Sequence, residues 1–189
     1  MKNRSITLVV ILTALLSLMA TQTIYAGWDP REDKTESSNT GNREVDKAIS
    51  RLKSKDPGLK LFFKKAYGYA IFPTVGKGGI GIGGAYGEGE VYRQDKFIGT
   101  SSLSQLTIGF QLGGQAYTEI IFFKNKHALD DFTSGNFEFN AQASAVAVTA
   151  GASADADYDN GVAIFTMPKG GLMYEATVGG QKFSFDPAR

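Results

Sequence analysis

His127 and the acids that follow it are the residues best suited to general acid or base chemistry. The imidazole lies within one helical turn of Asp130 and Asp131, and a histidine beside a carboxylate can accept a proton from a substrate. Catalysis needs a mutually oriented set of groups, and no serine motif accompanies this pair in a chain that contains no cysteine. We therefore expect His127 to be an exposed helix residue, and we expect neither enzymatic activity nor a cofactor.

A second set of possible ligands lies in the segment DADYDNG. Its acids Asp155, Asp157 and Asp159 have the spacing of the first oxygen ligands of a calcium loop. The EF-hand pattern then fails, because Asn160 occupies the sixth position and Thr166 stands where the bidentate glutamate belongs. Asn-Gly is instead typical of a type I′ hairpin turn. We expect a turn and no metal site, with a weak calcium site as the alternative.

The glycine-rich stretch VGKGGIGIGGAYGEGEVY, residues 75–92, contains two overlapping G-x-G-x-x-G matches. A phosphate-binding loop of this kind needs a strand before the glycines and a helix after them. Here the glycines run directly into AYGEGEVY, which has strand character, and no G-K-[ST] ending is present. We therefore expect no nucleotide site.

Alternation within this stretch is more informative than the motif. One side of an extended chain would carry only small residues: Gly79, Gly81, Gly83, Ala85, Gly87 and Gly89. Glycine in a strand suits a place where another group must approach the backbone closely. We expect close internal packing in a sharply bent sheet, so that Gly81→Val would fold poorly. The alternative is that an extended acyl chain lies along this glycine face.

Positive charge is concentrated in residues 43–65, which hold eight basic residues and three acids. The charges that could meet an anionic headgroup are Arg51, Lys53, Lys55, Lys60, Lys64 and Lys65. Leu59, Phe62 and Phe63 form the apolar stripe of the same segment and could enter a membrane interface. The same stripe could equally cover the sheet, so Phe62 and Phe63 are either core residues or membrane-inserting residues.

The chain begins with the features of a secretory signal peptide. Lys2 and Arg4 precede an apolar run from Ile6 to Leu16, which is shorter than the roughly 20 residues that span a bilayer. We predict cleavage after Ala26 and an exported, periplasmic or secreted protein. Cleavage removes two basic groups and no acid from a chain of formal charge +1, so global charge predicts no nucleic-acid partner.

The remaining chain is expected to form one domain behind a flexible leader. Residues 27–42 are polar and almost free of aliphatic side chains, which is typical of a leader that does not fold. Residues 43–55 and a second short segment after Asp56-Pro57 have helical stripes, with Asp56 as the cap of the second helix. The domain is therefore expected to span residues 43–189.

After Tyr67 the hydrophobic period changes from 3.6 to 2, which indicates a sheet. The expected strands include residues 67–73 and 116–123, with further short strands separated by glycine turns, and 137–151 as an alanine-rich strand. One short helix, residues 125–132, is expected between them, capped by Asn125. The predicted class is α+β: N-terminal amphipathic helices, then a curved, mostly antiparallel, glycine-rich sheet with one inserted helix.

Three of these segments together resemble the SYLF domain family. GYAIFPTVGKGGIGIGGAYGEGEVY, residues 68–92, is similar to the family's opening strand and glycine-rich block. GFQLGGQAYTEIIFF, residues 109–123, is similar to its most distinctive signature, and ALDDF followed by FEFNAQASAVAVTAG is similar to the rest. The resemblance covers about residues 43–185 in order.

The resemblance implies a non-enzymatic, lipid-binding module. Eukaryotic members bind phosphoinositides and are tied to actin assembly at membranes, and their binding is attributed to a basic amphipathic segment ahead of the glycine block. That segment corresponds here to residues 43–65. We therefore expect an exported protein that binds the surface of anionic phospholipid membranes. An acyl-chain carrier and a small outer-membrane β-barrel are the alternatives.

Overall fold

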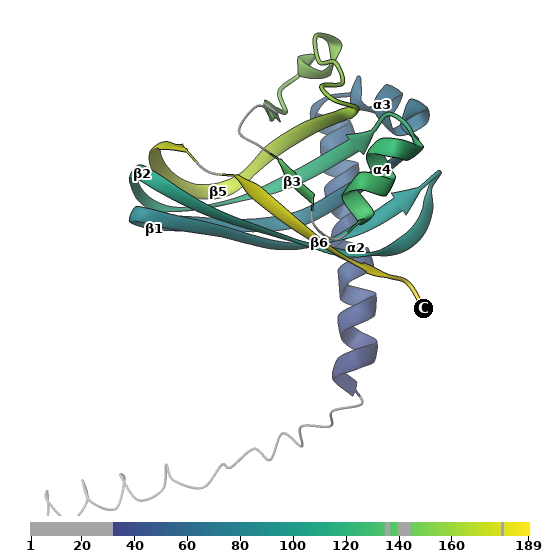
Figure 1. Ribbon diagram of the computed structural model, residues 1–189, viewed down its shortest axis with the longest axis horizontal. Helices are drawn as coiled ribbons and strands as arrows, with labels where there is room; N and C mark the ends of the chain where they lie inside the picture. The colour runs from purple at the N-terminus through teal and green to yellow at the C-terminus, as the bar shows by residue number, and fades with distance from the viewer. Residues whose placement is uncertain (1–31, 135–136, 140–144, 179) are drawn as a thin grey trace, which may run out of the picture. The chain divides into compact units, whose positions relative to one another are not determined.

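Residues 32–134, 137–139, 145–178 and 180–189 are described by a computed structural model (Figure 1). The chain divides into two units, Met1–Ser37 and Ser38–Arg189, and the fold presented here is that of the second unit. The predicted signal peptide, residues 1–26, lies outside the described residues, as do residues 27–31 of the predicted leader.

Three α-helices occur in the described part of the chain, together with one 3₁₀ turn. They are α2 (Glu32–Lys55), α3 (Leu59–Lys65), α4 (Lys126–Thr133) and η1 (Ala152–Ala154). The helix expected over residues 43–55 is thus the C-terminal part of a longer helix that begins at Glu32. Its buried residues Val45, Ala48 and Leu52 follow the predicted stripe, so packing against the sheet involves this C-terminal part.

One mixed sheet contains all six strands. They are β1 (Gly68–Arg93), β2 (Lys96–Phe123), β3 (Phe137–Phe139), β4 (Val146–Ala147), β5 (Val162–Val178) and β6 (Gln181–Pro187). The long strand β2 pairs antiparallel with β1, β5 and β6, and β6 pairs antiparallel with β3. Only β4 and β5, within the described strands, pair in parallel. The predicted α+β class is confirmed.

The strands β1, β2 and β5 are much longer than the short strands expected from the sequence. The glycine-rich segments bend them without ending them, since Gly81 has φ +72° and Gly113 has φ +115°, where other residues are strained. A register shift between Ile80 and Ile82 marks the bend in β1, and another lies at Pro73 between Phe72 and Val75. These glycines therefore lie at bends within long strands and not at turns between short strands.

The two halves of β1 meet face to face across the inside of this bend. A Cβ built on Gly89 would lie 2.4 Å from the Ile71 carbonyl oxygen and 2.7 Å from Cδ1 of Phe72. A Cβ on Gly87 would lie 2.8 Å from Cγ2 of Val75. The close internal packing expected of the glycine row is confirmed at these two positions, and the group that approaches is the first half of the same strand.

The expected glycine face is interrupted at the bend. Gly83, Ala85, Gly87 and Gly89 are buried, but Gly81 is exposed and a Cβ placed on it would meet no atom within 4 Å. The register shift beside Gly81 breaks the alternation on which the prediction depended. Close packing is therefore the wrong reason for expecting Gly81→Val to fold poorly. Backbone strain at φ +72° is the reason that glycine suits this position.

Two apolar clusters lie on opposite faces of the sheet. The concave-face cluster combines Phe72 and Val91 of β1 with Ile121 of β2 and with residues of α4. The helical-face cluster combines the stripes of α2 and α3 with Ile71, Ile120, Phe122 and Phe165. Successive β2 residues thus alternate between the two clusters, as strand geometry requires.

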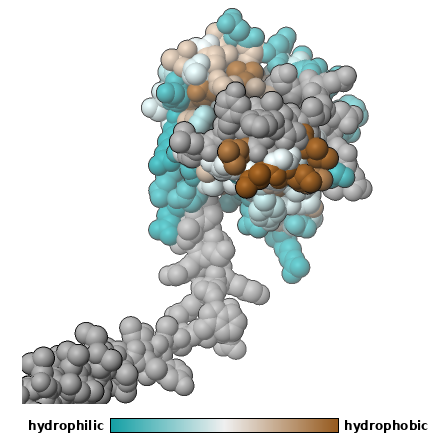
Figure 2. All heavy atoms as spheres, turned by 90° about the vertical axis from the view of Figure 1, so that its left-hand side faces the viewer, coloured by the Kyte–Doolittle hydropathy of each residue, from teal (hydrophilic) through white to brown (hydrophobic). Residues whose placement is uncertain are grey.

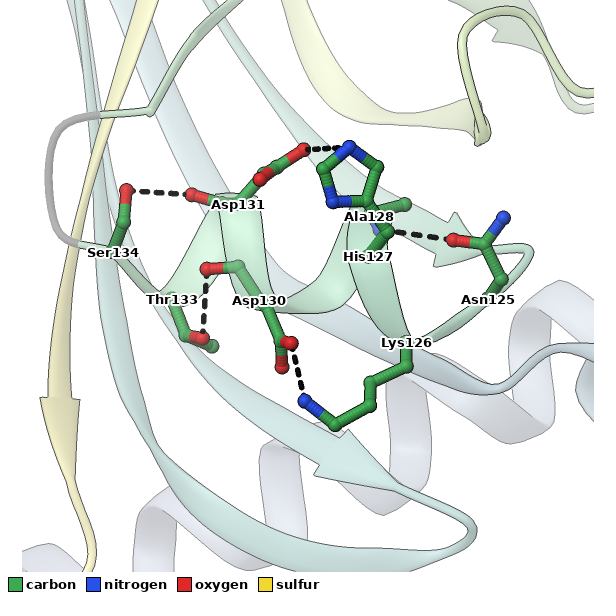
Figure 3. A network of polar contacts seen from close by, with 8 residues as sticks. All are labelled: Asn125, Lys126, His127, Ala128, Asp130, Asp131, Thr133 and Ser134. Carbon is green, nitrogen blue, oxygen red and sulfur yellow. Dashed lines mark hydrogen bonds and ion pairs between the residues drawn. The ribbon is translucent and has the colours of Figure 1, made fainter.

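Helix α4 closes the concave face and has the cap that the sequence predicted (Figure 3). The Asn125 side chain accepts a hydrogen bond from the Ala128 N–H at 3.0 Å. Ala128, Leu129 and Phe132 are buried, and the Phe132 ring lies 5.2 Å from that of Phe183 on β6. The predicted short helix over residues 125–132 is confirmed.

Adding one methyl group at Gly89 should destabilise the domain. Gly89→Ala would push Cβ into a backbone carbonyl and a phenyl ring, and overpacking of this kind typically costs about 1–3 kcal/mol. Gly76→Ala is the matched control, since a Cβ there would meet no atom within 4 Å. Urea unfolding of both variants tests the prediction, and equal stability of the two would show that the strand halves do not pack as described.

Candidate functional site

The basic residues predicted to bind lipid lie on the outer surface of α2 and α3. The exposed ones are Arg51, Lys55, Lys60, Lys64 and Lys65. Lys53 differs, because its ammonium group lies 4.1 Å from the centre of the Phe63 ring in a cation–π contact. We call the five exposed residues the helical cations.

None of the helical cations forms a close ion pair with an acid in the described part of the chain. Ion pairs there join Lys47 to Glu44, Lys126 to Asp130 and, when the imidazole is protonated, His127 to Asp131, and none includes a helical cation. The Glu44 carboxylate, whose pKa is lowered chiefly by its hydrogen bond with Lys47, attracts Arg51 only from a longer distance. The acid closest to them in sequence, Asp56, is buried. Their charge is therefore available to an external anion.

Lys64 and Lys65 line a groove at the C-terminal end of α3, which we call the first basic groove. Its volume is about 400 Å³, and Lys124 from the end of β2 and Asp95 from the β1–β2 turn line it as well. Three cations and one acid therefore face one concavity, which favours an anionic group.

Arg51 and Lys55 line a second, wider groove beside α2. This second basic groove has a volume of about 660 Å³ and is completed by Lys169 of β5 and by two serine hydroxyls, Ser50 and Ser54. Cations and hydroxyls in one concavity are the groups that bind phosphate oxygens. The predicted set of basic residues is thus divided between two grooves, while Lys60 lies in neither lining.

Three residues of this surface were missed by the sequence analysis. Lys124 and Lys169 come from strands far along the chain, and no local pattern links them to residues 43–65. Leu61 lies outside the buried stripe of α3 and is 53% exposed between Lys60 and Lys64. The exposure of Leu61 could have been predicted from the helical period, which places its side chain on the face opposite the buried Leu59.

Phe62 and Phe63 pack into the helical-face cluster. The Phe62 ring lies 5.0 Å from that of Phe165 in an edge-on contact, and the Phe63 ring lies 4.9 Å from that of Phe122. Insertion of either ring into a membrane would break these contacts. Of the two readings left open by the sequence, the structure thus favours the core position for both side chains.

A buried carboxylate fixes α3 relative to the rest of the domain. Asp56 Oδ1 accepts a hydrogen bond from the Gly58 N–H at 3.0 Å, and Oδ2 accepts one from the Ser153 N–H of η1 at 2.7 Å. Burial works to raise the pKa of Asp56, but these hydrogen bonds and those from the Ser153 hydroxyl and Gly151 outweigh it and lower the pKa. Asp56 thus joins two segments of the domain. The prediction that it caps the second helix is wrong, because α3 begins at Leu59 with Gly58 as its N-cap and no side chain caps it.

His127 has the exposed position that the sequence predicted (Figure 3). Its side chain is 85% exposed, and Nε2 lies 3.4 Å from Oδ2 of Asp131 one turn along α4. The nearby Ser134 hydroxyl donates to the Asp131 backbone carbonyl at 2.7 Å instead of to the imidazole. These three groups are therefore not arranged as a catalytic set.

The acids of the segment DADYDNG lie around a hairpin turn. Asp159 and Val162 exchange two backbone hydrogen bonds of 2.9 Å, and Asn160 and Gly161 both have positive φ, which confirms the type I′ turn. Asp157 accepts a bond from the adjacent Tyr158 N–H. No group of three or more acids or histidines able to hold a metal ion occurs in the described residues.

The glycine-rich motif lies in the interior of β1, which continues through a hairpin into β2 and not into a helix. The arrangement that a phosphate-binding G-x-G-x-x-G loop requires is therefore not formed by these glycines. Within the described residues, no helix combines the length and the apolar character that crossing a membrane requires.

Fold and surface define a class of protein: a domain with a doubled-over glycine-rich sheet that presents cationic helices to solvent. Residues 104–188 match the family described as Ysc84, Las17-binding protein actin regulator, which is the SYLF family. The chain therefore belongs to the SYLF family, as the sequence resemblance implied. Domains of this family are generally lipid-binding and non-enzymatic.

A curated relative supports the family assignment. Beta cell expansion factor A of Aeromonas veronii is 30% identical over 154 residues, which are 77% of this chain and 56% of the relative. The chain thus spans about half the length of the curated relative it matches.

Loss of the Asp56 carboxylate should loosen α3 and lower stability. In Asp56→Asn a single side-chain oxygen remains, and the amide NH₂ must face the N–H of either Gly58 or Ser153. At least one charge-assisted hydrogen bond is therefore lost, at a cost of about 2 kcal/mol near neutral pH. Because the folded pKa of Asp56 is lowered, this stabilisation is present above the unfolded value of 3.8 and is lost as pH falls through the folded value.

Thermal unfolding of the wild type and Asp56→Asn from pH 7 to pH 2 measures this contribution. The difference between the two proteins should be largest near neutral pH and should shrink below pH 3.8. Asp46→Asn, an exposed change on α2, serves as the control and should leave stability nearly unchanged. A difference that stays constant down to pH 2 would contradict the assigned role.

Proposed function

We propose that this protein binds the surface of membranes that contain anionic phospholipid, through the helical cations of α2 and α3. The observation that carries the proposal is that five neighbouring cations are exposed and form no close ion pair in the described chain. The general lipid-binding character of SYLF domains supports it.

Electrostatics can supply useful affinity at this surface. Each lysine or arginine near an anionic leaflet contributes about 1 kcal/mol, and the effect falls off within a Debye length. The two basic grooves gather four helical cations with Lys124 and Lys169, so several charges can meet headgroups together. Leu61, exposed among lysines, adds an aliphatic side chain that can enter the interface.

A second exposed surface lies at the bend of β1 and β2. Five large aliphatic side chains there are 58% to 80% exposed: Ile80, Ile82, Leu106, Ile108 and Leu112. The register pairs Ile80 with Leu112 and Ile82 with Ile108, so these side chains are neighbours across the two strands. Figure 2 faces this end of the sheet and shows hydrophobic residues gathered on it. We call them the aliphatic patch.

We assign a lipid bilayer as the partner of the aliphatic patch. Its five members are purely aliphatic, and contiguous exposed surfaces of this kind mark interaction sites rather than ordinary surface. Unpaired cations on the same domain and the lipid-binding character of the family favour lipid over another protein. Insertion of Ile82 or Ile108 would add affinity that salt does not screen.

The alternative of an acyl-chain carrier along the glycine face has little room in this fold. Gly87 and Gly89 are already in contact with the first half of β1, at distances that leave no space for a hydrocarbon chain. Export is proposed from the features of residues 1–26 alone, and the actin-related description of the family is not proposed for this chain.

Charge reversal in the first basic groove should weaken binding to anionic vesicles. Lys64→Glu combined with Lys65→Glu removes about 2 kcal/mol of attraction, or roughly 30-fold in partitioning, before added repulsion. Sedimentation of the exported, processed protein with vesicles of phosphatidylglycerol and phosphatidylcholine measures the effect. The mass of the same purified protein tests separately whether the signal peptide is cleaved after Ala26.

Lys182→Glu combined with Arg189→Glu is the control for net charge, since both residues are exposed and lie on β6 or just after it. This control should bind like the wild type. Equal binding of the wild type to anionic and neutral vesicles would defeat the electrostatic mechanism. So would equal losses in the two double variants.

Polar substitution in the aliphatic patch should lower the part of binding that persists at high salt. Ile82→Thr with Ile108→Thr keeps β-branched side chains but removes apolar contact worth about 2 kcal/mol in total. Binding in about 0.5 M salt, where the Debye length is only a few ångströms, isolates this contribution. Phe97→Thr, an exposed apolar residue near the β1–β2 turn, is the control.

Unchanged high-salt binding by the double threonine variant would overturn the assignment of the patch to lipid. Sedimentation without vesicles adds a second criterion. A dimer of the wild type that dissociates in the variant would show that a second copy of the chain covers the patch instead.

A further inference from the structure

Glu119 is a fully buried acid in the middle of the longest strand. It lies on β2 with 0% exposure, paired in register with Phe72 of β1 and Thr166 of β5. Acidic side chains are rarely buried so completely unless a cation or several hydrogen bonds compensate them. Burial of this carboxyl group is therefore not explained by a contribution to the stability of the fold.

Only one of the two carboxylate oxygens of Glu119 is satisfied by the described protein. Oε2 accepts a hydrogen bond from Nε2 of Gln181 on β6 at 3.0 Å, whereas Oε1 is buried and no described donor reaches it. A buried acceptor without a donor costs about 1–3 kcal/mol, and more when it is charged. Oε1 is thus a strong acceptor in need of a donor.

The carboxyl group lines a polar cavity on the concave face of the sheet. The cavity has a volume of about 240 Å³ and draws Lys77 from β1, Gln105 and Gln115 from β2, Thr166 from β5 and Gln181 from β6. Because a water molecule occupies about 30 Å³ of liquid, there is room for a small organic molecule. Three amide side chains around one carboxylate can both donate and accept hydrogen bonds.

No charge of a described residue contributes to the pKa of this carboxyl group. Burial raises the pKa of Glu119 to about 7, and the only opposing influence is the hydrogen bond from Gln181. Lys77 and the phenol of Tyr117 are the other titratable groups among the described lining residues, and Thr166 and Gln181 are neutral. Neither Lys77 nor Tyr117 contributes to this shift.

We propose that this cavity binds a small molecule bearing a primary ammonium group, which donates a hydrogen bond to Oε1 of Glu119. An ammonium supplies both the missing donor and the missing positive charge. The amides of Gln105 and Gln115 then bind polar atoms on the rest of the ligand. The site is distinct from the helical cations and does not depend on the proposed membrane binding.

Proton linkage gives the site a pH signature. The ammonium group pairs with the ionised carboxylate, so binding competes with protonation of Glu119. Between pH 6 and pH 8 the ionised fraction of a carboxyl with a pKa of about 7 rises roughly tenfold, and affinity should rise with it. Binding at pH 6 should release a proton.

Calorimetric titration of the full mature protein with ethanolammonium chloride at pH 6, 7 and 8 tests the proposal. We expect one saturable site, with affinity about tenfold higher at pH 8 than at pH 6. Tetramethylammonium carries the charge without an N–H, and ethylene glycol carries a hydroxyl without the charge. Both should bind at least tenfold more weakly than ethanolammonium.

Glu119→Gln preserves the shape of the side chain and should abolish both the binding and its pH dependence. Glu88→Gln, which changes an exposed acid of β1 that accepts a bond from Tyr86, is the matched control and should bind like the wild type. ¹³C NMR of the glutamate carboxyl carbons adds a readout independent of ligand. One resonance should titrate near pH 7 and be missing from the spectrum of Glu119→Gln.

Absence of saturable ethanolammonium binding at pH 8, or equal binding by the wild type and a folded Glu119→Gln protein, would overturn the proposal. A second arm identifies the source of the amine. Soluble phosphoethanolamine and vesicles containing phosphatidylethanolamine present the same ammonium group, and competition by each against ethanolammonium shows whether free amines or lipid headgroups reach Glu119. If neither compound displaces ethanolammonium, the cavity does not accept amines that carry a phosphate substituent, and this result would contradict the proposed binding of substituted amines.

Discussion

The contact between the two halves of β1 is the constraint on which the domain depends. Two halves of one strand can pack against each other this closely only where side chains are missing at the contact. Gly87 and Gly89 have no side chain, and the segment from Ile71 to Val75 packs directly against them. The bend at Gly81 brings these segments together, and β2 stays paired with β1 on both sides of it, with a register shift between Ile80 and Ile82. Because β2 also pairs with β5 and β6, one self-contact sets the curvature of the entire sheet.

That curvature divides the protein into two chemical environments. On the concave face, apolar side chains pack against α4, and polar ones gather around Glu119. On the outer face, α2 and α3 bury their aromatic rings and leave their lysines outside. At the bend, Ile80 and Ile82 stay exposed, and no described helix covers them. Each proposed surface is thus a consequence of how the sheet folds over.

Much of this could be predicted from the sequence where a local rule decides the outcome. Asn125 caps its helix and Asn160-Gly161 makes its turn because both depend on neighbouring backbone alone. The long strands could not be predicted, since a glycine that ends a strand and one that bends it look alike. The grooves could not be predicted either, because Lys124 and Lys169 reach the helical cations only through the tertiary fold.

Glu119 was missed although a signal was present. In AYTEIIFF it shares one side of the strand with Ile121 and Phe123, so alternation places a carboxyl group on a buried face. Replacing such a group by an apolar residue of similar size is often neutral or stabilising in other proteins. A domain held together by close backbone contact and aromatic packing has little need of that carboxylate for stability. Its unsatisfied oxygen, next to a polar cavity, is better explained by a ligand than by the fold.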